Sequence, residues 1–442
     1  MKVSVTMNAV IVAVAVMLIL SLLRINVVLS LVLGAFVGGL TSGMSIEATV
    51  ESFTEGLGAG ATIALSYGLL GAFAIAIAKT GIPELMITGM LKILNSESNR
   101  KGLVKVLIFF LIFLMSILSQ NVIPIHIAFI PLLIPPVLKI LNMLEVDRRL
   151  VATLIAVGLI GTYSFVPAGF GAIFQDIVAT QVSEAGMVVS SRDVPVAMAI
   201  PVLGMLVGLF TAFIVYRKPR HYKNNEIEAD SLHVNVSKFV MFSTAFALVV
   251  SLCAQVLTDS MIVGSFAGIM VMYFTGALKW KEADDILSEG MKMMAFIGFV
   301  MIAANGFAAV INATGHVDNL ITSSITILKG NRSLAVFIML VIGLVVTMGI
   351  GSSFATVPII ATLFVPLAQG LGMSPLAILC LIGTAGALGD AGSPASDSTL
   401  GPTAGLNVDG QHHHIWDTCV PTFIFINIPL ILFGWIACVF FL

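Results

Sequence analysis

Two short polar motifs, ILSQNVIP at residues 117–124 and GSSFATVP at residues 351–358, each interrupt a long apolar stretch. Their prolines, Pro124 and Pro358, lie 234 positions apart. Chance matches would scatter over many offsets, so a shared offset predicts an internal duplication. Further pairs with this offset are Gly34 and Gly268, Glu55-Gly56 and Glu289-Gly290, Phe73 and Phe307, Thr80-Gly81 and Thr314-Gly315, and Ser119 and Ser353.

Apolar segments fill both copies. Hydrophobic residues make up 58% of the 442-residue chain and charged residues 10%, a composition that excludes a soluble globular protein. A membrane helix needs about 20 largely apolar residues, so the sequence predicts an all-α polytopic membrane protein. The segments lie at 5–22, 26–42, 59–79, 103–118, 122–142, 150–166 and 195–216, and again at 238–257, 260–277, 293–312, 333–350, 354–371, 374–388 and 421–441.

Each polar motif is expected to form the tip of a re-entrant hairpin. Polar residues and proline in mid-membrane leave backbone groups without helical partners, and such breaks persist only where protein or a water-filled cavity satisfies them. A hairpin enters and leaves on one side, so about five transmembrane helices remain per half. Because five is odd, the halves are expected to form two inverted repeats with broken helices at the midplane, as in many secondary transporters.

One distinctly polar stretch, RKPRHYKNNEIEADSLHVN at 217–235, separates the halves. We interpret residues 1–216 as the first inverted repeat, 217–237 as a cytoplasmic linker and 238–442 as the second inverted repeat. With this linker inside and both termini external, nearly all lysines and arginines fall on the cytoplasmic side, as the positive-inside rule requires. The exceptions are Lys2, Arg192, Lys329 and Arg332.

The second half contains a helix break rich in functional residue types, GTAGALGDAGSPASDSTLGPTAG at residues 383–405. Asp390 and Asp397 follow an apolar segment, and a carboxylate within a membrane is costly unless it faces a cavity, a cation or a partner. The glycines and proline free backbone carbonyls, which are hard oxygen ligands for a dehydrated Na⁺. Nearby hydroxyl ligands are Ser393, Ser396 and Ser398.

The two carboxylates are expected to have different roles. Asp397 is expected to carry the coupling cation or proton, because Ser396 and Ser398 flank it and their oxygens could converge on one ion. Asp390 stands at the end of the apolar segment and is expected to cap the following half-helix. A purely structural capping role remains the alternative for either residue.

Further candidate binding residues lie at the hairpin tips and in the first half. Helix N-termini that meet at the tips could hold an anionic group, while free carbonyls serve a cation. The break at 161–176 adds Thr162 and, less directly, Asp176. His126 and Asn305 are either site residues or satisfied structural side chains. The tip residues are Ser119, Gln120, Asn121, Ser352, Ser353 and Thr356.

Three consecutive histidines, His412 to His414, are flanked by Asp409 and Asp417. Consecutive side chains cannot all point at one ion, so no metal beyond Na⁺ is expected, and the role of these histidines stays open. The chain contains neither a Walker-type phosphate loop nor a catalytic-triad signature, so we expect no enzymatic activity and no cofactor apart from Na⁺ and/or H⁺ as the coupling ion.

The string GALGDAGSPASDST resembles the signature of the NhaC-type sodium/proton antiporter family, part of the ion transporter superfamily. HHIWDTCVP at 413–421 looks like the counterpart of a histidine segment that precedes the last helix in that family. The resemblance implies ten crossings plus two hairpins, a scaffold domain that commonly dimerises, and a transport domain that moves like an elevator. The matching residues are Gly389, Asp390, Ser393, Pro394, Ser396, Asp397, Ser398 and Thr399.

Together these features predict a cation-coupled secondary active transporter of a bacterial-type cytoplasmic (inner) membrane. Its expected partners are the lipid bilayer, a small ion or small-molecule substrate and a second copy in a homodimer. The net charge of −2 argues against nucleic acid. The alternative is a Na⁺- or H⁺-coupled amino acid uptake transporter on the same fold, with the hairpin tips gripping the substrate. A passive channel is disfavoured, because duplicated broken helices suit alternating access.

Overall fold

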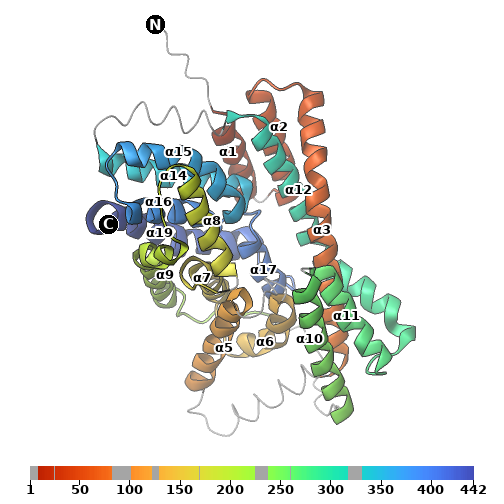
Figure 1. Cartoon of the computed structure of the whole chain (residues 1–442). Helices are drawn as coiled ribbons and strands as arrows, with labels where there is room; N and C mark the ends of the chain where they lie inside the picture. The colour runs from red at the N-terminus through yellow and green to blue at the C-terminus, as the bar shows by residue number, and fades with distance from the viewer. Residues whose placement is uncertain are drawn as a thin grey trace.

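The computed structural model describes residues 8–23, 25–81, 101–121, 129–168, 170–223, 237–258, 260–316 and 331–442, and these residues form helices and connections without a strand (Figure 1). The longer helices of the first half are α1 Ala9–Leu22, α2 Val27–Thr41, α3 Ile46–Lys79, α5 Lys101–Asn121, α6 Phe129–Met143, α7 Arg148–Phe165, α8 Phe170–Glu184 and α9 Val194–Val215. Those of the second half are α10 Lys238–Thr258, α11 Met261–Phe274, α12 Ala283–Ala313, α14 Arg332–Ile350, α15 Ser353–Gly370, α16 Pro375–Ala387, α17 Asp397–Leu406 and α19 Ile428–Ile436. The short elements are η1 Ser191–Asp193, η3 Trp280–Glu282, η4 His414–Cys419, α18 Val420–Thr422, η5 Phe423–Asn427 and η6 Ala437–Phe441.

In the part of the chain that the structure describes, every apolar segment predicted from the sequence coincides with helix, which confirms an all-α protein with many membrane spans. Within the described residues, 7 helices are long and apolar enough to cross a membrane, or up to 8 if the two parts of the bent α15 count as one span. Several apolar helices are shorter, so the ten crossings that the resemblance implies would require some of these to cross as well. The shorter helices are α1, α2, α5, α11 and α16.

Helix α8 was not predicted from the sequence. The break expected at 161–176 is much shorter, because α7 continues to Phe165 and α8 begins at Phe170. The buried residues of α8 recur every three or four positions, from Gly171 through Phe174 and Val178 to Val182. A one-sided helix of this kind has no continuous apolar run, so a search for such runs misses it.

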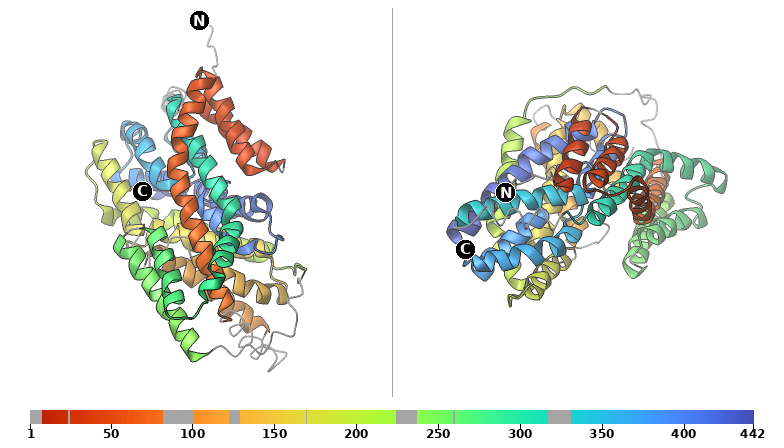
Figure 2. Two further views of the ribbon diagram at one scale, coloured as in Figure 1. Left: turned by 90° about the vertical axis from the view of Figure 1, so that its right-hand side faces the viewer. Right: turned by 90° about the horizontal axis from the view of Figure 1, so that it is seen from above.

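The two long helices α3 and α12 lie side by side along one side of the molecule (Figures 1 and 2). A Cβ atom at Gly56 would lie 2.5 Å from the Asn305 carbonyl oxygen, and one at Gly290 would lie 2.5 Å from the Gly71 carbonyl carbon. Any side chain there would collide with backbone, so glycine is required at both crossings. The contacts run in opposite sequence directions, so α3 and α12 are antiparallel.

The sequence offset of 234 positions relates these two contacts to each other. Gly56 and Gly290 lie 234 positions apart, as do Gly71 and Asn305. A second such set joins other helices, because Phe307 of α12 packs on Gly34 of α2 and Phe73 of α3 packs on Gly268 of α11. Both phenylalanines are buried. Residues that lie 234 positions apart therefore make equivalent contacts, and each of these contacts joins the first half to the second.

The second polar motif separates two helices that pack on each other. Helix α14 ends at Ile350, Gly351 has a φ of 74°, and α15 begins at Ser353. Helix α15 is bent by 47° between Ala361 and Phe364. In the first half, α5 ends at Asn121 and α6 begins at Phe129. The connection between α5 and α6, with His126, lies outside the described residues.

Candidate functional site

The break in the second half is a buried loop between α16 and α17. Two glycines in it have positive φ, 86° at Gly389 and 80° at Gly392, where other residues are strained. A Cβ atom at Gly389 would lie 2.8 Å from the Met348 backbone nitrogen, and one at Gly392 would lie 2.6 Å from Cβ of Phe423. The glycines therefore let the loop pack tightly between α14 and the C-terminal helical segment, residues 414–441.

Two side chains of the C-terminal segment satisfy the backbone of this loop. Asn427 Oδ1 accepts from the Gly389 N–H at 3.3 Å, and Asn427 Nδ2 donates to the Ala391 carbonyl at 2.6 Å. Thr422 Oγ1 accepts from the Gly392 N–H at 3.1 Å. Unpaired backbone groups are costly away from water, so these contacts stabilise the break. Sequence reasoning missed both residues, although a lone asparagine in the apolar run FIFINIP is a recognisable signal.

Asp390 is buried, and both its carboxylate oxygens accept hydrogen bonds. Oδ1 accepts from the Ser396 hydroxyl at 2.7 Å, and Oδ2 accepts from the Tyr163 hydroxyl at 2.7 Å and the Ser398 hydroxyl at 3.3 Å. The Tyr163 oxygen also lies 2.8 Å from Ser353 Oγ at the start of α15. This cluster joins α7, the second hairpin motif and the break at one carboxylate.

Asp397 differs from Asp390, because its Oδ1 is buried and has no hydrogen-bond partner among the residues that the structure describes. The buried Tyr67 of α3 lies close enough to the same carboxyl group to interact with it electrostatically. Asp397 is the first residue of α17, where the helix dipole favours a negative charge. The structure therefore places an incompletely bonded carboxylate between the break and α3.

The expected division of roles around these carboxylates was wrong in two details. The cap of α17 is Ser396, whose Oγ accepts from the Ser398 N–H at 3.1 Å, and not Asp390. The hydroxyls of Ser396 and Ser398 both donate to Asp390 and not to Asp397. Ser393 donates to the Met348 carbonyl at 3.1 Å and so anchors the loop to α14.

The remaining candidates lie apart from this cluster or bond elsewhere. Thr162 is buried in α7 and donates to the Gly158 carbonyl of its own helix. Asn305 donates to the Met301 carbonyl of α12 at 2.9 Å, and Asp176 is exposed on α8. At the second tip, Thr356 donates to the Ser352 carbonyl at 2.8 Å, and Ser352 makes no side-chain cap bond. The side chains of Ser119, Gln120 and Asn121 lie outside the described part of the chain.

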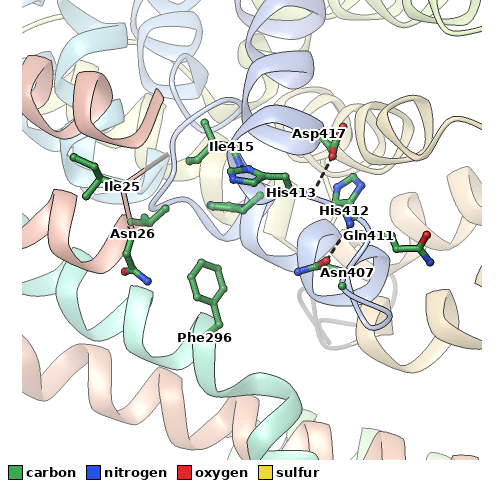
Figure 3. Close-up of a pocket in the computed structure, with 12 residues that line it drawn as sticks. Ile25, Asn26, Phe296, Asn407, Gln411, His412, His413, Ile415 and Asp417 are labelled. Atoms are coloured by element: carbon green, nitrogen blue, oxygen red, sulfur yellow. Dashed lines mark hydrogen bonds between the residues drawn. The ribbon is translucent and has the colours of Figure 1, made fainter. Parts of the chain in front are cut away.

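The three histidines are among the residues that line a cavity of about 510 Å³, and Figure 3 labels two of them, His412 and His413. They have different partners: His412 Nε2 lies 2.6 Å from Thr418 Oγ1, His413 Nδ1 accepts from the Ile415 N–H at 3.2 Å, and His414 bonds toward the break. No group of three His, Cys, Asp or Glu side chains in the described ranges could hold a metal ion. The cavity is lined by Ile25, Asn26, Val27, Phe296, Asn407, Gly410, Gln411, His412, His413, His414, Ile415 and Asp417.

An ion pair between the fully buried Arg148 and the partly buried Asp409 lies beside this cavity. Arg148, at the start of α7, donates to both oxygens of Asp409 at 2.6 and 2.5 Å and to the Leu406 carbonyl at 2.8 Å. Partial burial opposes ionisation of Asp409, but the bonds from Arg148 outweigh it and hold the pKa of its carboxyl below the ordinary value of 3.8.

The first residues of the predicted linker join this cluster. Arg220 donates to Asp417 at 2.7 Å, and the backbone of Lys223 exchanges two hydrogen bonds of 2.7 Å with the Gln411 side chain. The Tyr222 hydroxyl accepts from the Arg148 N–H at 3.0 Å. Residues 217–223 are therefore held by hydrogen bonds next to the cavity lined by the histidines. Residues 224–236 lie outside the described residues.

Known proteins match the chain over most of its length. The family described as "Na+/H+ antiporter family" matches residues 154–435, and one described as "Na+-H+ antiporter family" matches residues 8–94. A Bacillus subtilis protein named "Putative amino acid transporter YuiF" is 53% identical, over 98% of this chain and 99% of its own. Uncharacterized membrane proteins of Vibrio parahaemolyticus and Haemophilus influenzae are 52% and 47% identical, over 98% and 97% of this chain and 99% and 98% of theirs.

Two solved structures have weaker similarity. Neisseria gonorrhoeae MtrF, described within a class of antimetabolite efflux pumps, is 20% identical with a TM-score of 0.39, over 88% of this chain and 83% of its own. The Alcanivorax borkumensis YdaH transporter is 13% identical with a TM-score of 0.39, over 88% of both chains. The first family match includes the break and the C-terminal segment that stabilises it, and it covers more than half of the chain. As the signature predicted, the chain belongs to the Na⁺/H⁺ antiporter family.

Proposed function

We propose that this protein is a secondary active transporter that exchanges Na⁺ for H⁺ at Asp390 and Asp397. The observation that carries the proposal is the buried Oδ1 of the half-buried Asp397, which has no hydrogen-bond partner among the described residues. An ionised carboxylate in a low-dielectric site needs a cation or a proton to offset its charge. Asp390 already accepts three hydrogen bonds. Asp397 is therefore the group left to bind the transported ion.

A site that binds either Na⁺ or H⁺, but not both at once, can exchange one ion for the other. Two nearby carboxylates in a buried site disfavour each other's ionisation, so a proton on Asp397 stabilises the empty site and Na⁺ stabilises the ionised one. Na⁺ and H⁺ compete for the one negative charge of Asp397. With either ion bound, the site can switch from facing one side of the membrane to facing the other. Coupling of opposite fluxes then follows from the site itself.

The proposed architecture is two inverted repeats with an elevator-type motion. The matching contacts of antiparallel α3 and α12 support inversion, because equivalent spanning helices then cross in opposite directions. We assign α3 and α12 to a scaffold that forms a homodimer, and the break to the moving domain. The contact of Tyr67 with Asp397 lies on that boundary. In this arrangement the linker is cytoplasmic and both termini are external, in a bacterial inner membrane.

A second candidate is Na⁺- or H⁺-coupled amino acid uptake on the same fold. The observation in its favour is the relative at 53% identity whose name is "Putative amino acid transporter YuiF". Its geometric support is the closeness of the second tip to the break, since a Cβ atom at Gly351 would lie 3.2 Å from the Ala395 carbonyl oxygen. A substrate held at the tip would then contact the cation site.

The test uses purified protein in proteoliposomes and the isosteric change Asp397→Asn. Wild type should alkalinise the lumen when Na⁺ is higher outside and acidify it when Na⁺ is higher inside. Asp397→Asn should lose this exchange while it stays folded. The matched control is Asp285→Asn, which changes an exposed carboxylate in the first turn of α12. If Asp397→Asn exchanges with unchanged ion dependence, the assignment is wrong. Uptake of labelled amino acids driven by either gradient would favour the second candidate.

A further inference from the structure

Four buried polar side chains form a continuous chain next to the cavity. His412 Nε2 lies 2.6 Å from Thr418 Oγ1, and Thr403 Oγ1 lies 3.0 Å from Thr418 Oγ1. Thr403 Oγ1 also lies 2.8 Å from His414 Nδ1. Each of these residues is at most 5% exposed. The chain alternates imidazole nitrogens with hydroxyls, and both groups can donate and accept a proton.

The two ends of this chain lie in different places. His412 forms part of the cavity wall, and its buried Nδ1 has no hydrogen-bond partner within the described ranges. His414 Nε2 lies 2.9 Å from the carbonyl oxygen of Pro394, inside the break between Asp390 and Asp397. One end is therefore at the cavity and the other is at the candidate cation site.

The geometry restricts where protons can sit. A carbonyl oxygen only accepts, so His414 Nε2 must carry a hydrogen. If the Thr403 hydroxyl donates to His414 Nδ1, the His414 ring is neutral. If Thr403 donates to Thr418 or to the Thr399 carbonyl, at 3.0 and 2.9 Å, then Nδ1 must be the donor and the ring is a cation. The same heavy-atom positions thus accommodate two states that differ by one proton.

We propose that His412, Thr418, Thr403 and His414 form a proton conduit that delivers H⁺ from the cavity to the break. A proton binds His412 Nδ1, and the Nε2 proton passes to the Thr418 oxygen. The Thr418 hydroxyl, which accepts from Thr403 in the structure, rotates so that its proton passes to Thr403, and the Thr403 proton passes to His414 Nδ1. One proton has entered, one positive charge has moved to His414, and both hydroxyls have reversed direction. The inference rests on the proposed Na⁺/H⁺ exchange, for which it supplies the proton path.

The His414 cation would act on the cation site through its charge. Its Nε2 bonds the loop that carries Asp390 and Asp397, so a positive charge there opposes bound Na⁺, and bound Na⁺ opposes the charge by the same amount. The aromatic ring of Phe296 in α12 packs edge-on at 6.1 Å, and Cys419 Sγ lies 3.6 Å from Nε2. These apolar neighbours disfavour a permanent charge, so the cation is transient.

Charged groups from three elements face the conduit at its cavity end. Asp417 of η4 favours a proton on His412, whereas Arg148 of α7 and Arg220 of the linker disfavour it. His413 is the titratable neighbour of His414. Burial is the larger effect and, with the two arginines, outweighs Asp417 and lowers the pKa of His412 to about 3, so His412 is neutral at rest.

The test separates proton movement from Na⁺ movement in proteoliposomes. Thr403→Val and Thr418→Val remove one hydroxyl each at nearly constant volume, so each should slow Na⁺/H⁺ exchange by at least about tenfold. Exchange of radioactive Na⁺ for unlabelled Na⁺ needs no proton and should persist. Thr403→Ser restores a hydroxyl and should restore the coupled rate. The matched control is Thr153→Val, since buried Thr153 bonds only its own helix, at the Arg149 carbonyl.

Each outcome decides one proposal. Folded Thr403→Val that exchanges Na⁺ for H⁺ at the wild-type rate overturns the conduit and leaves the proposed function intact. Loss of both exchanges in folded Thr403→Val also overturns it, because Thr403 would then belong to the Na⁺ site. If Thr403→Val does not fold, Thr418→Val and His412→Phe give the same comparison. Failure of the proposed function shows separately, as wild type that exchanges no Na⁺ for H⁺.

Discussion

At Tyr163 a single hydroxyl contacts two candidate site residues from different elements. It donates to Asp390 and lies next to Ser353, so it joins the second hairpin motif to the break. Its ring packs against Phe174 of α8 and Phe354 of α15, with centroid distances of 4.9 and 5.9 Å. This aromatic packing fixes where the hydroxyl lies, and thereby the orientation of the Asp390 carboxylate.

Replacing Tyr163 with Phe should remove that link and keep the packing. We expect a loss of about 1–3 kcal/mol in stability, because buried Asp390 loses a donor. Thermal unfolding in detergent measures the effect. The control is Tyr273→Phe, since the buried Tyr273 hydroxyl has no partner among the described residues and its removal should not destabilise the protein. Equal destabilisation by both changes would contradict the importance of the Asp390 bond.

The carboxylates of the site could be found from sequence, but their partners could not. Asp390 and Asp397 stand out because charge in an apolar segment is costly, and that cost can be read locally. Tyr163, Thr422 and Asn427 are close to the break only through packing of helices distant in sequence. Hydrogen-bond direction is likewise a tertiary property, and for this reason Ser396 and Ser398 were expected at the wrong carboxylate.

At the scale of helices, the α3–α12 pair depends on glycine. Without a hydrophobic force between helices in lipid, close packing of small residues is a main source of association. A Cβ atom at Gly290 would lie 2.1 Å from the Ala72 backbone nitrogen, and one at Gly60 would lie 2.5 Å from Cα of Ile302. These contacts are with backbone, so no side-chain rotation can relieve a collision.

Gly290→Ala should therefore separate α3 from α12. We expect a loss of about 3 kcal/mol or more, or failure to fold, because overpacking against backbone shifts whole helices. The matched control is Gly58→Ala in α3, where a Cβ atom would meet nothing within 4 Å. That change should stabilise the helix by up to about 1 kcal/mol. Unfolding temperatures in detergent would contradict this account if Gly290→Ala matched wild type.

The positions of most helices followed from apolar runs, whereas α8 and the first turns of α3 did not. Helix α3 begins 13 residues before the predicted segment at 59–79, at a cap where the Ser45 side chain accepts from the Ala48 N–H. Its early turns carry Glu47, Glu51 and Glu55, which are exposed on the helix. A hydropathy pattern misses such polar turns, but the recurrence of glutamate every four residues does predict one solvated helical face here.

For the whole molecule, the pairing of Arg148 with Asp409 ties α7 to the turn after α17. Asp409→Asn should cost about 3–5 kcal/mol, because it leaves the fully buried Arg148 without a counter-charge. Since the pKa of Asp409 is lowered in the folded state, the pair stabilises fully above the ordinary value of 3.8 and its contribution is lost as pH falls through the lowered pKa. Unfolding temperature measured from pH 7 to pH 3 should fall less steeply with acid in the variant than in wild type.

The orientation of the chain gives a further prediction. The positive-inside rule predicts that the 217–237 linker is cytoplasmic, so Asn225→Cys should resist an impermeant thiol reagent added to intact cells and should react after lysis. The background is the same labelling of wild type, whose four cysteines are Cys253, Cys380, Cys419 and Cys438. Labelling of Asn225→Cys above this background in intact cells would reverse the topology.

The length of α3 sets a relation between the protein and its membrane. Its 34 residues extend about 51 Å at 1.5 Å per residue, whereas the hydrocarbon core is about 30 Å thick. Even at a tilt of about 40°, it would span about 39 Å along the membrane normal. The end that carries the exposed glutamates must therefore reach the headgroup layer. A thinner or thicker bilayer changes the tilt of α3, and because the buried Tyr67 of this helix lies near Asp397, we expect lipid thickness to act on the candidate ion site.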